Sequence, residues 1–401
     1  MRQSCSNRTI ACMTLTCHTA GESHGPCAIA LVDGMPAGLT LDIDFINQEL
    51  KRRQGGYGRG GRQAIENDKV EFLAGVRHGA TTGAPIIVYI VNKDNRLEDD
   101  KATPPIHRPR PGHADLAGAI KWLSNDCRNT LERASARETA ARTAAGAIAR
   151  CLLNEFDIEV FGFVRGMLDA IAPTEPTQEN WRMLRDARDD SDVYCPDDAT
   201  CKAIIEHIRT AKTQKDTVGG TCETHVFGCP IGLGSCTSWQ SKLDSRLAGA
   251  VMGIQAFKAV EIGLGTECSA RFGSQVHDPI HFDGSSRNES HFGFTRPTNR
   301  AGGIEGGMSN GMPIVVRGTM KPISTLLQGM DSVDLLTGEA QRSDYERSDV
   351  CALPAASVVM ENVVGFEVAV AFLESFGGAT MDVVRAAYDA FAESARKIVP
   401  S

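Results

Sequence analysis

Residues 134–153 read ASARETAARTAAGAIARCLL, a stretch rich in alanine and arginine that contains no proline. Both residue types favour helices, so we expect a long helix from about Ser135 to Asn154. Two further helices are expected over 355–376 and 381–398, separated by Gly377 and Gly378. Another is expected over 240–259, where apolar residues recur at helical spacing: Leu243, Leu247, Val251, Ile254 and Phe257.

Two strands are expected on either side of RHGATTGA (77–84), from Val70 to Val76 and from Pro85 to Val91, because both runs are rich in β-branched residues. Strands and helices interleave without regular βαβ alternation, and no GxGxxG motif opens a helix, which disfavours a Rossmann domain. No Pro- or Ser-rich linker divides the chain, and the acidic segment 185–198 is expected to be an exposed insertion. The sequence therefore predicts one large α+β domain.

The composition narrows the functional classes. Hydrophobic residues make up 42% of the 401 residues and charged residues 23%, which excludes disordered, coiled-coil and collagen-like chains. The net charge of −8 argues against a nucleic-acid-binding protein as a whole. The longest apolar run is far shorter than the roughly 18 residues of a membrane span, and residues 1–12 do not resemble a secretory leader, so we expect a cytoplasmic protein. The 13 cysteines show no CxxC pair or zinc-type spacing, and we expect no metal site.

Positive charge is concentrated in the glycine-rich segment KRRQGGYGRGGR (51–62), which has no acidic residue. Flexible glycines would let its arginines close over a polyanionic ligand. Two other interpretations are open: an arginine–glycine segment that binds single-stranded RNA, and a solvated loop without function.

Two segments present histidines in glycine- or proline-rich loops, AGESHGP (20–26) and HRPRPGHAD (107–115). Histidine exchanges protons near neutral pH, and the arginines of the second segment offer forked donors for phosphate or carboxylate. The alternatives are a turn histidine in the first segment and a basic loop in the second.

Three further segments combine capping and functional features. In RASARET (133–139), Ser135 and Glu138 have capping-box spacing, while the same helix start would direct N–H groups at a phosphate. The glycines of 302–311, followed by KPIST (321–325), suit a phosphate-bearing aromatic cofactor or simply a turn-rich β region. In RSDVCA (347–352), Asp349 is either a base or a helix cap.

Taken together and in this order, the segments resemble the chorismate synthase family. The family's AGESHG, RPGHAD, RxSARETA, KPIST and RSDxCA motifs all have counterparts, as do QAxKxVEIG at 255–263 and NxAGGIxGGxSNG at 299–311. The resemblance extends from about residue 14 to the end. Two departures are mild: KDTVGG (215–220) stands for GDSVGG, and Cys17 occupies a position where a bulky residue is expected.

The resemblance implies a lyase of the shikimate pathway that converts 5-enolpyruvylshikimate 3-phosphate to chorismate by 1,4-elimination of phosphate and a ring proton. It also implies a need for reduced FMN without net redox change, a β-α-β sandwich with helices between antiparallel sheets, and a homotetramer. Residues 1–12 are expected to be an N-terminal extension to a single domain over 13–401, with Met13 as an alternative start.

The resemblance also implies roles for individual residues. His24 would protonate the leaving phosphate, His113 would protonate the reduced flavin, and Asp349 would assist proton removal. The positions matching the family's FMN site are Arg133, Ala134, Ser135, Gln255, Ala256, Gly306, Lys321, Pro322, Ile323, Ser324, Thr325 and Arg347. Those matching substrate- or NADP-binding positions are Arg53 and Arg59, followed by Arg52 and Arg137.

The compact chain suggests a monofunctional enzyme that depends on an external flavin reductase, although an intrinsic NADPH-dependent flavin reductase activity is open. The competing classes are a catalytically silent flavoprotein or flavin reductase in the same pocket, and an RNA-binding module. Joint retention of His24, His113 and Asp349 argues against the silent flavoprotein.

Overall fold

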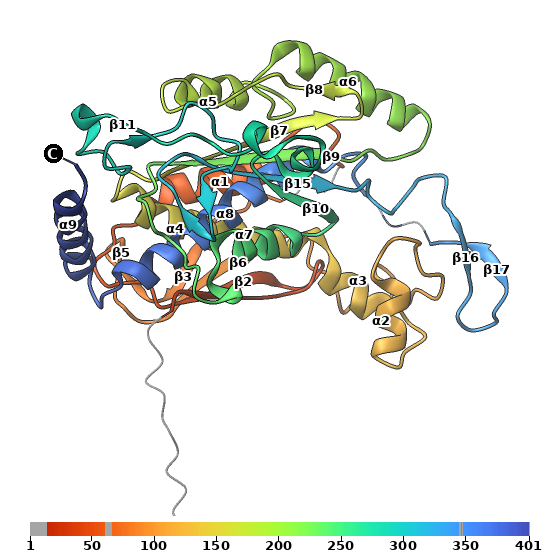
Figure 1. Ribbon diagram of the computed structural model, residues 1–401. Coiled ribbons are helices and arrows are strands. Elements are labelled where there is room, and N and C mark those ends of the chain that lie inside the picture. Colours follow the sequence, from red (N-terminus) through yellow and green to blue (C-terminus); the bar gives the residue numbers. More distant parts are fainter. Residues whose placement is uncertain (1–13, 61–65, 345, 347, 401) are drawn as a thin grey trace, which may run out of the picture.

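The computed structural model describes residues 14–60, 66–344, 346 and 348–400. A layer of helices lies between two antiparallel sheets, which confirms the α+β class and the sandwich that the resemblance implied (Figure 1). The lower sheet has strand order β1-β2-β6-β3, with β1 (Thr16–Ala20), β2 (Cys27–Asp33), β6 (Ile86–Val91) and β3 (Glu71–Ala74). The upper sheet has order β10-β15-β9-β7-β8, with β10 (Phe257–Ile262), β15 (Ile314–Met320), β9 (Gly220–Phe227), β7 (Glu159–Met167) and β8 (Ala170–Ile171).

The helical layer consists of α1 (Ile43–Gln54), α4 (Thr139–Asn154), α7 (Leu243–Met252) and α8 (Leu353–Phe376). In α4, 14 of the 16 residues are buried, because the helix contacts α8 and strands of both sheets. A Cβ atom added at Gly146 would lie 2.2 Å from the carbonyl oxygen of Asn362, so the glycine allows α4 and α8 to approach closely.

Helix α8 is long and apolar enough to cross a bilayer by length and composition alone. However, 89% of its most apolar window is buried inside the protein. A helix that is hydrophobic all round and enclosed by other elements is typical of a protein core, and we assign α8 to the core.

Helices α5 (Trp181–Asp189) and α6 (Asp198–Thr213) cover the outer face of the upper sheet (Figure 1). The prediction that 185–198 is an exposed insertion is therefore wrong. Trp181 stacks on Phe227 with ring centroids 5.6 Å apart, and the buried Arg188 donates a hydrogen bond of 2.7 Å to the carbonyl oxygen of Gly162. The acidic residues form only the solvent side of a segment that packs on the sheet.

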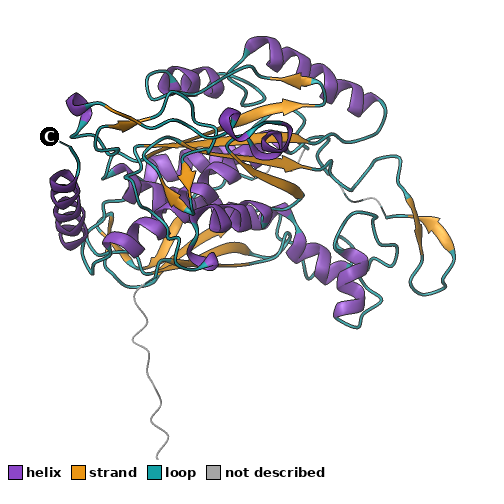
Figure 2. Cartoon of the chain, viewed as in Figure 1, coloured by secondary structure: helices purple, strands orange, loops and turns teal. Residues whose placement is uncertain are grey.

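The other helices and the short strand pairs lie outside the two main sheets (Figure 2). They comprise α2 (Asp115–Lys121), α3 (Arg128–Ala134), α9 (Met381–Ile398) and the short pairs β4 (Val76–Arg77) with β5 (Ala80–Thr81), β11 (His281–Phe282) with β12 (Phe294–Thr295), β13 (Ile304–Glu305) with β14 (Met308–Ser309), and β16 (Asp331–Val333) with β17 (Ala340–Arg342). In Figure 1, α2, α3 and the β16–β17 hairpin project from one side of the sandwich.

Most predicted elements are confirmed with small shifts of their ends. Strands β3 and β6 pair as expected, and α8 and α9 fall where two helices were predicted. The helix predicted over 240–259 is too long, because α7 ends at Met252. Ala256 adopts a φ of +69°, which breaks a helix, and Phe257 instead pairs with Met320 in β10.

Candidate active site

A single cavity of about 530 Å³ brings most of the predicted site residues together. Its wall comes from the turn after β1, the end of α1, the start of α2, the junction of α3 and α4, and the segments after α7, after β15 and before α8. The predicted residues that line it are His24, Arg53, Arg59, His113, Ala134, Ser135, Arg137, Gln255, Ala256, Lys321, Ile323, Ser324, Thr325 and Asp349.

Arg52 does not line this cavity, although it was a candidate for binding substrate. Its guanidinium donates hydrogen bonds of 2.5 Å to Glu49 and 3.0 Å to Glu361 inside the helical layer. Adjacent residues of a helix point about 100° apart, so Arg53 faces the cavity while Arg52 faces α8. The structure therefore does not support Arg52 as a substrate-binding residue.

Three predicted cofactor residues also lie elsewhere. Arg133 donates hydrogen bonds to the carbonyl oxygens of Gly21 at 3.2 Å and Thr19 at 2.9 Å. Gly306 forms the turn between β13 and β14. Pro322 is absent from the described cavity lining, and Arg347 lies outside the described residues.

The cavity wall is predominantly positive. Among the described residues that line it, the cations are Arg53, Arg59, Arg96, Arg110, Arg137 and Lys321, and the carboxylates are Glu66, Glu346 and Asp349. An acidic protein with net charge −8 thus concentrates six cationic side chains around one hollow. This arrangement favours a ligand with several negative charges.

Arg53 and Arg137 share the buried carboxylate of Asp68. The Arg53 Nη2 atom lies 2.7 Å from Asp68 Oδ2, and the Arg137 Nη1 atom lies 2.8 and 2.7 Å from the two carboxylate oxygens. Burial lowers the pKa of Arg53 to about 10, and repulsion from Arg137 acts in the same direction. The attraction of Asp68 opposes this shift without cancelling it. Burial alone would raise the pKa of Asp68, but the two arginines lower it. Nothing in the sequence marked Asp68.

His24 rests on the buried carboxylate of Glu132 from α3. The His24 Nδ1 atom lies 2.9 and 3.1 Å from the Glu132 oxygens, and the His24 backbone N–H donates to Glu132 Oε2 at 2.8 Å. Burial would raise the pKa of Glu132, but the hydrogen bonds from His24 lower it below its usual range. The side chain of Asn92 donates to the carbonyl oxygen of Gly25 at 2.7 Å and accepts from Arg137 Nε at 2.6 Å, which connects the histidine turn to the arginine pair.

His113 has a similar arrangement at the start of α2. Its Nδ1 atom is bonded to Asp115, a buried carboxylate that also accepts from Arg110 Nε at 2.8 Å. Arg110 Nη1 donates in turn to Thr325 Oγ1 at 2.9 Å. Burial would raise the pKa of Asp115, but the hydrogen bonds from His113 and Arg110 hold it well below its usual range. The RPGHAD motif contained Asp115 but gave it no role.

The glycine-rich segment after α1 brings Arg59 to Asp349. The Arg59 Nη1 atom lies 2.7 Å from Asp349 Oδ2, and the Gly60 backbone N–H donates to Asp349 Oδ1 at 2.6 Å. A Cβ atom at Gly56, whose φ is +97°, would lie 2.5 Å from Pro354, so only glycine permits this close approach. The described part of the segment, 55–60, is thus packed against the start of α8, unlike a solvated loop.

Three further residues of the cavity lining, Gln255, Lys321 and Ser135, bear polar groups. The Oε1 atom of Gln255 is buried and has no hydrogen-bond partner among the described residues, whereas its Nε2 donates to Glu138 at 3.0 Å. The Lys321 Nζ atom donates to the carbonyl oxygen of Gly112 at 2.7 Å, and burial together with Lys258 lowers its pKa. Ser135 accepts from the backbone N–H of Arg137 at 3.3 Å, so it caps the 3-10 turn before α4 and not α4 itself. The Glu138 side chain bonds Thr19, Arg142 and Gln255, so the predicted capping box is only partly realised.

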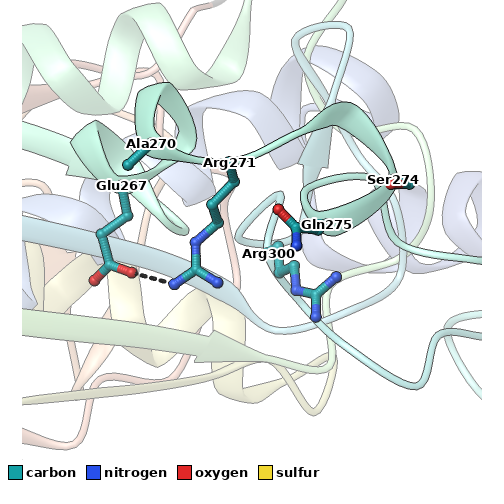
Figure 3. Close-up of a pocket in the computed structure, with 6 residues that line it drawn as sticks. All are labelled: Glu267, Ala270, Arg271, Ser274, Gln275 and Arg300. Atoms are coloured by element: carbon teal, nitrogen blue, oxygen red, sulfur yellow. Dashed lines mark hydrogen bonds and ion pairs between the residues drawn. The ribbon is translucent and has the colours of Figure 1, made fainter.

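A second hollow of about 530 Å³ lies on the surface between Glu267 and Arg300 (Figure 3). Its lining is largely exposed, and Arg271 is already paired with Glu267 at 2.6 Å. None of the predicted site residues lines it. In the part of the chain that the structure describes, no cluster of three or more His, Cys, Asp or Glu side chains suits a metal ion.

Comparison with known proteins gives a consistent result. The family model described as chorismate synthase matches residues 15–373. A chorismate synthase of Desulforamulus reducens is 48% identical over 392 residues, covering 95% of this chain and 99% of the relative, and one of Desulforudis audaxviator is 50% identical over 374 residues, covering 90% and 93%. A crystal structure of chorismate synthase aligns with a TM-score of 0.78 and 36% identity, over 96% of this chain and 99% of that one.

Proposed function

This chain belongs to the chorismate synthase family, and on that premise we propose that its reaction takes place in the cavity lined by His24, His113 and Asp349. The family reaction is the 1,4-elimination of phosphate and a ring proton from 5-enolpyruvylshikimate 3-phosphate, and it requires a reduced flavin without net redox change. The observation that carries the proposal is that six cationic side chains line the same cavity as two histidines, and that each histidine is bonded to a buried carboxylate.

The residues present fit FMN as the flavin. The cavity falls within the range of about 300–1,000 Å³ typical of small-molecule sites, and the buried Oε1 atom of Gln255 offers an acceptor that no described residue uses. Gln255, Ala256 and the segment from Lys321 to Thr325 would hold the cofactor. When bound, the reduced flavin supplies an electron transiently to the elimination.

We assign His24 to protonation of the leaving phosphate. Because Glu132 holds the Nδ1 side of the ring, Nε2 is the nitrogen near the cavity cations, and it lies 3.3 Å from Arg96 Nη2. Charge develops on the phosphate oxygen as its bond to carbon breaks. A positioned acid together with nearby guanidinium groups stabilises that charge.

His113 and Asp349 occupy the other end of the reaction. Asp115 bonds to Nδ1 of His113 and fixes the ring at the cavity wall, where we assign it to proton transfer with the flavin. Asp349 would assist removal of the ring proton. Its carboxylate is held between Arg59 and the Gly60 N–H, so binding of an anionic substrate to Arg59 would leave the carboxylate available.

We further propose a monofunctional cytoplasmic enzyme that acts as a homotetramer and obtains reduced FMN from an external reductase. The support is the family membership and the high coverage of bacterial relatives by this chain. NADPH-dependent reduction of the flavin by the enzyme itself is the alternative.

The decisive experiment is anaerobic turnover of 5-enolpyruvylshikimate 3-phosphate with dithionite-reduced FMN, followed by chorismate absorbance, beside a reaction with NADPH and oxidised FMN. Chorismate formed only with the chemically reduced flavin supports the monofunctional enzyme, whereas chorismate in both reactions adds an intrinsic reductase. The variants His24→Ala and His113→Ala should each lose at least about 100-fold in kcat while still binding FMN. Wild-type turnover in both variants would refute the assigned roles.

A further inference from the structure

A carboxylate that the sequence did not mark lies directly behind His24. The Glu132 side chain is 1% exposed, and both of its oxygens contact His24: Oε1 at 2.9 Å from the ring Nδ1, and Oε2 at 2.8 Å from the backbone N–H. A carboxylate that accepts from both groups fixes the position of the backbone and the rotation of the ring at once.

We propose that Glu132 is a positioning residue that fixes the His24 ring by its Nδ1 side, so that Nε2 is the nitrogen directed at the leaving phosphate. The inference rests on the proposed role of His24 as the acid. Glu132 would not touch the substrate, and its effect would pass entirely through the imidazole ring.

Among the residues that the structure describes, the charged groups that face the His24 ring come from two elements. Glu132 and Arg128 belong to α3, with Arg128 Nη1 at 3.4 Å from Glu132 Oε1. Asp94 and Arg96 belong to the segment after β6, at 3.9 Å and 3.3 Å from His24 Nε2. The Arg96 guanidinium can only donate, so it contacts Nε2 as an acceptor and opposes a charged ring, whereas Asp94 favours a charged ring. Glu132 is the nearest carboxylate, and its bidentate contact dominates the balance.

The electrostatics of Glu132 support the assignment. A buried carboxyl group without partners would become neutral, but the hydrogen bonds from His24 lower the pKa of Glu132, so it remains a carboxylate near neutral pH. The interaction is reciprocal: if the charged imidazole stabilises the carboxylate, the carboxylate stabilises the charged imidazole to the same extent.

The resulting proton transfer is balanced. The Nε2–H bond of the imidazolium breaks and a bond forms between that proton and a phosphate oxygen, while the electron pair of the substrate's carbon–oxygen bond stays with the phosphate. The neutral imidazole keeps the proton on Nδ1, which remains hydrogen-bonded to Glu132. Its Nε2 atom takes up another proton from solvent before the next turnover.

The test compares the pH dependence of kcat in Glu132→Gln with that of the wild type, using saturating reduced FMN and substrate. The amide keeps the shape of the side chain but removes its charge. We expect the alkaline limb of the profile to move about one pH unit lower, so that kcat falls about tenfold above the limb and approaches the wild-type value near pH 6. A purely structural defect would lower kcat at every pH.

Glu223→Gln is the matched control, because Glu223 is a buried carboxylate 2.8 Å from His225 outside the cavity. It should leave the alkaline limb unchanged. Glu132→Asp retains the charge at a greater distance and should move the limb by less than the amide does. It decides the question if Glu132→Gln does not fold.

An alkaline limb at the wild-type pH in Glu132→Gln, or in Glu132→Asp where only that variant folds, would overturn the inference. That failure is separate from failure of the proposed function. If His24→Ala turned over normally, the role of His24 itself would be wrong. If His24→Ala were inactive while the limb stayed in place, only the role of Glu132 would be.

Discussion

The carboxylate of Asp68 is paired with two arginines of the cavity, Arg53 and Arg137. Asp68→Asn therefore tests whether this carboxylate fixes the two guanidinium groups in the positions where an anion would bind. The Asp68 side chain is 0% exposed and lies 2.7 Å from Nη2 of Arg53 and from Nη1 of Arg137. Removing one partner of a buried ion pair costs about 3–5 kcal/mol, because the other charge is left unpaired. Asparagine keeps one acceptor oxygen, so we expect the free energy of unfolding to fall by about 3 kcal/mol, the lower end of that range.

The same substitution should weaken catalysis. Without the shared carboxylate, the two guanidinium groups repel each other and lose their fixed directions in the cavity wall. We expect kcat/KM to fall about 10- to 100-fold, equivalent to about 1.4–2.7 kcal/mol of lost transition-state stabilisation. Inorganic phosphate should raise the melting temperature of Asp68→Asn more than that of the wild type, because a bound anion would partly replace the missing charge.

Urea unfolding and steady-state kinetics measure the two effects. Asp331→Asn is the control, since Asp331 is 97% exposed and paired with Arg342 at the surface. That variant should change neither quantity by more than about 0.5 kcal/mol. An Asp68→Asn variant that unfolds within about 1 kcal/mol of the wild type and keeps its kcat/KM would refute the reasoning.

Two further predictions concern the same helical layer. Arg52→Ala should lower the free energy of unfolding by about 3–5 kcal/mol, while the folded enzyme keeps its kcat/KM. Arg53→Ala should instead lower kcat/KM at least about tenfold. Equal losses of kcat/KM in both variants would contradict the separation of the two side chains. Stability should also fall in acid through Glu49: burial raises its pKa, but Arg52 and Arg150 more than compensate and lower it from 4.5 to about 2. A lowered pKa stabilises the folded state above the ordinary value, and this stability is lost as pH falls toward 2. Urea unfolding between pH 7 and 3 should therefore show a shallower acid dependence in Glu49→Gln than in the wild type, and identical slopes would exclude this contribution.

The sequence predicted which segments meet at the site but not what holds them there. His24, His113 and Asp349 could be named because each stands in a motif that resembles one of the chorismate synthase family. Asp68 and Glu132 stand in ordinary surroundings, ENDKV and TLERA. Their importance arises only because the fold places them behind residues 15 to 108 positions away. A tertiary contact of this kind leaves no local pattern.

The errors in the predicted elements have the same origin. Apolar spacing extended the helix over 240–259 past its true end, because Ile254 and Phe257 belong to the same core as α7 although one lies in a turn and the other in a strand. Periodicity reports burial, and it cannot distinguish a helix that continues from a chain that leaves the helix and stays in the core. The prediction for the acidic segment 185–198 was wrong because it treated every charged residue as exposed, although Arg188 is buried.

His24 and His113 are each bonded through Nδ1 to a buried carboxylate, but the two carboxylates differ in how strongly nearby arginines neutralise them. Asp115 is already neutralised by Arg110, whose Nε and Nη2 atoms lie 2.8 and 3.0 Å from it, and Arg110 Nη2 also lies 3.0 Å from Nδ1 of His113. Arg128 reaches Glu132 only at 3.4 Å, so more of the carboxylate's charge acts on His24. Under the proposed roles, the carboxylate with more available charge therefore lies behind His24, assigned to the leaving phosphate, and the one with less lies behind His113, assigned to the flavin. The two imidazoles of one cavity are thus distinguished by their surroundings and not by the identity of the residues, which is the basis on which we propose different roles for them.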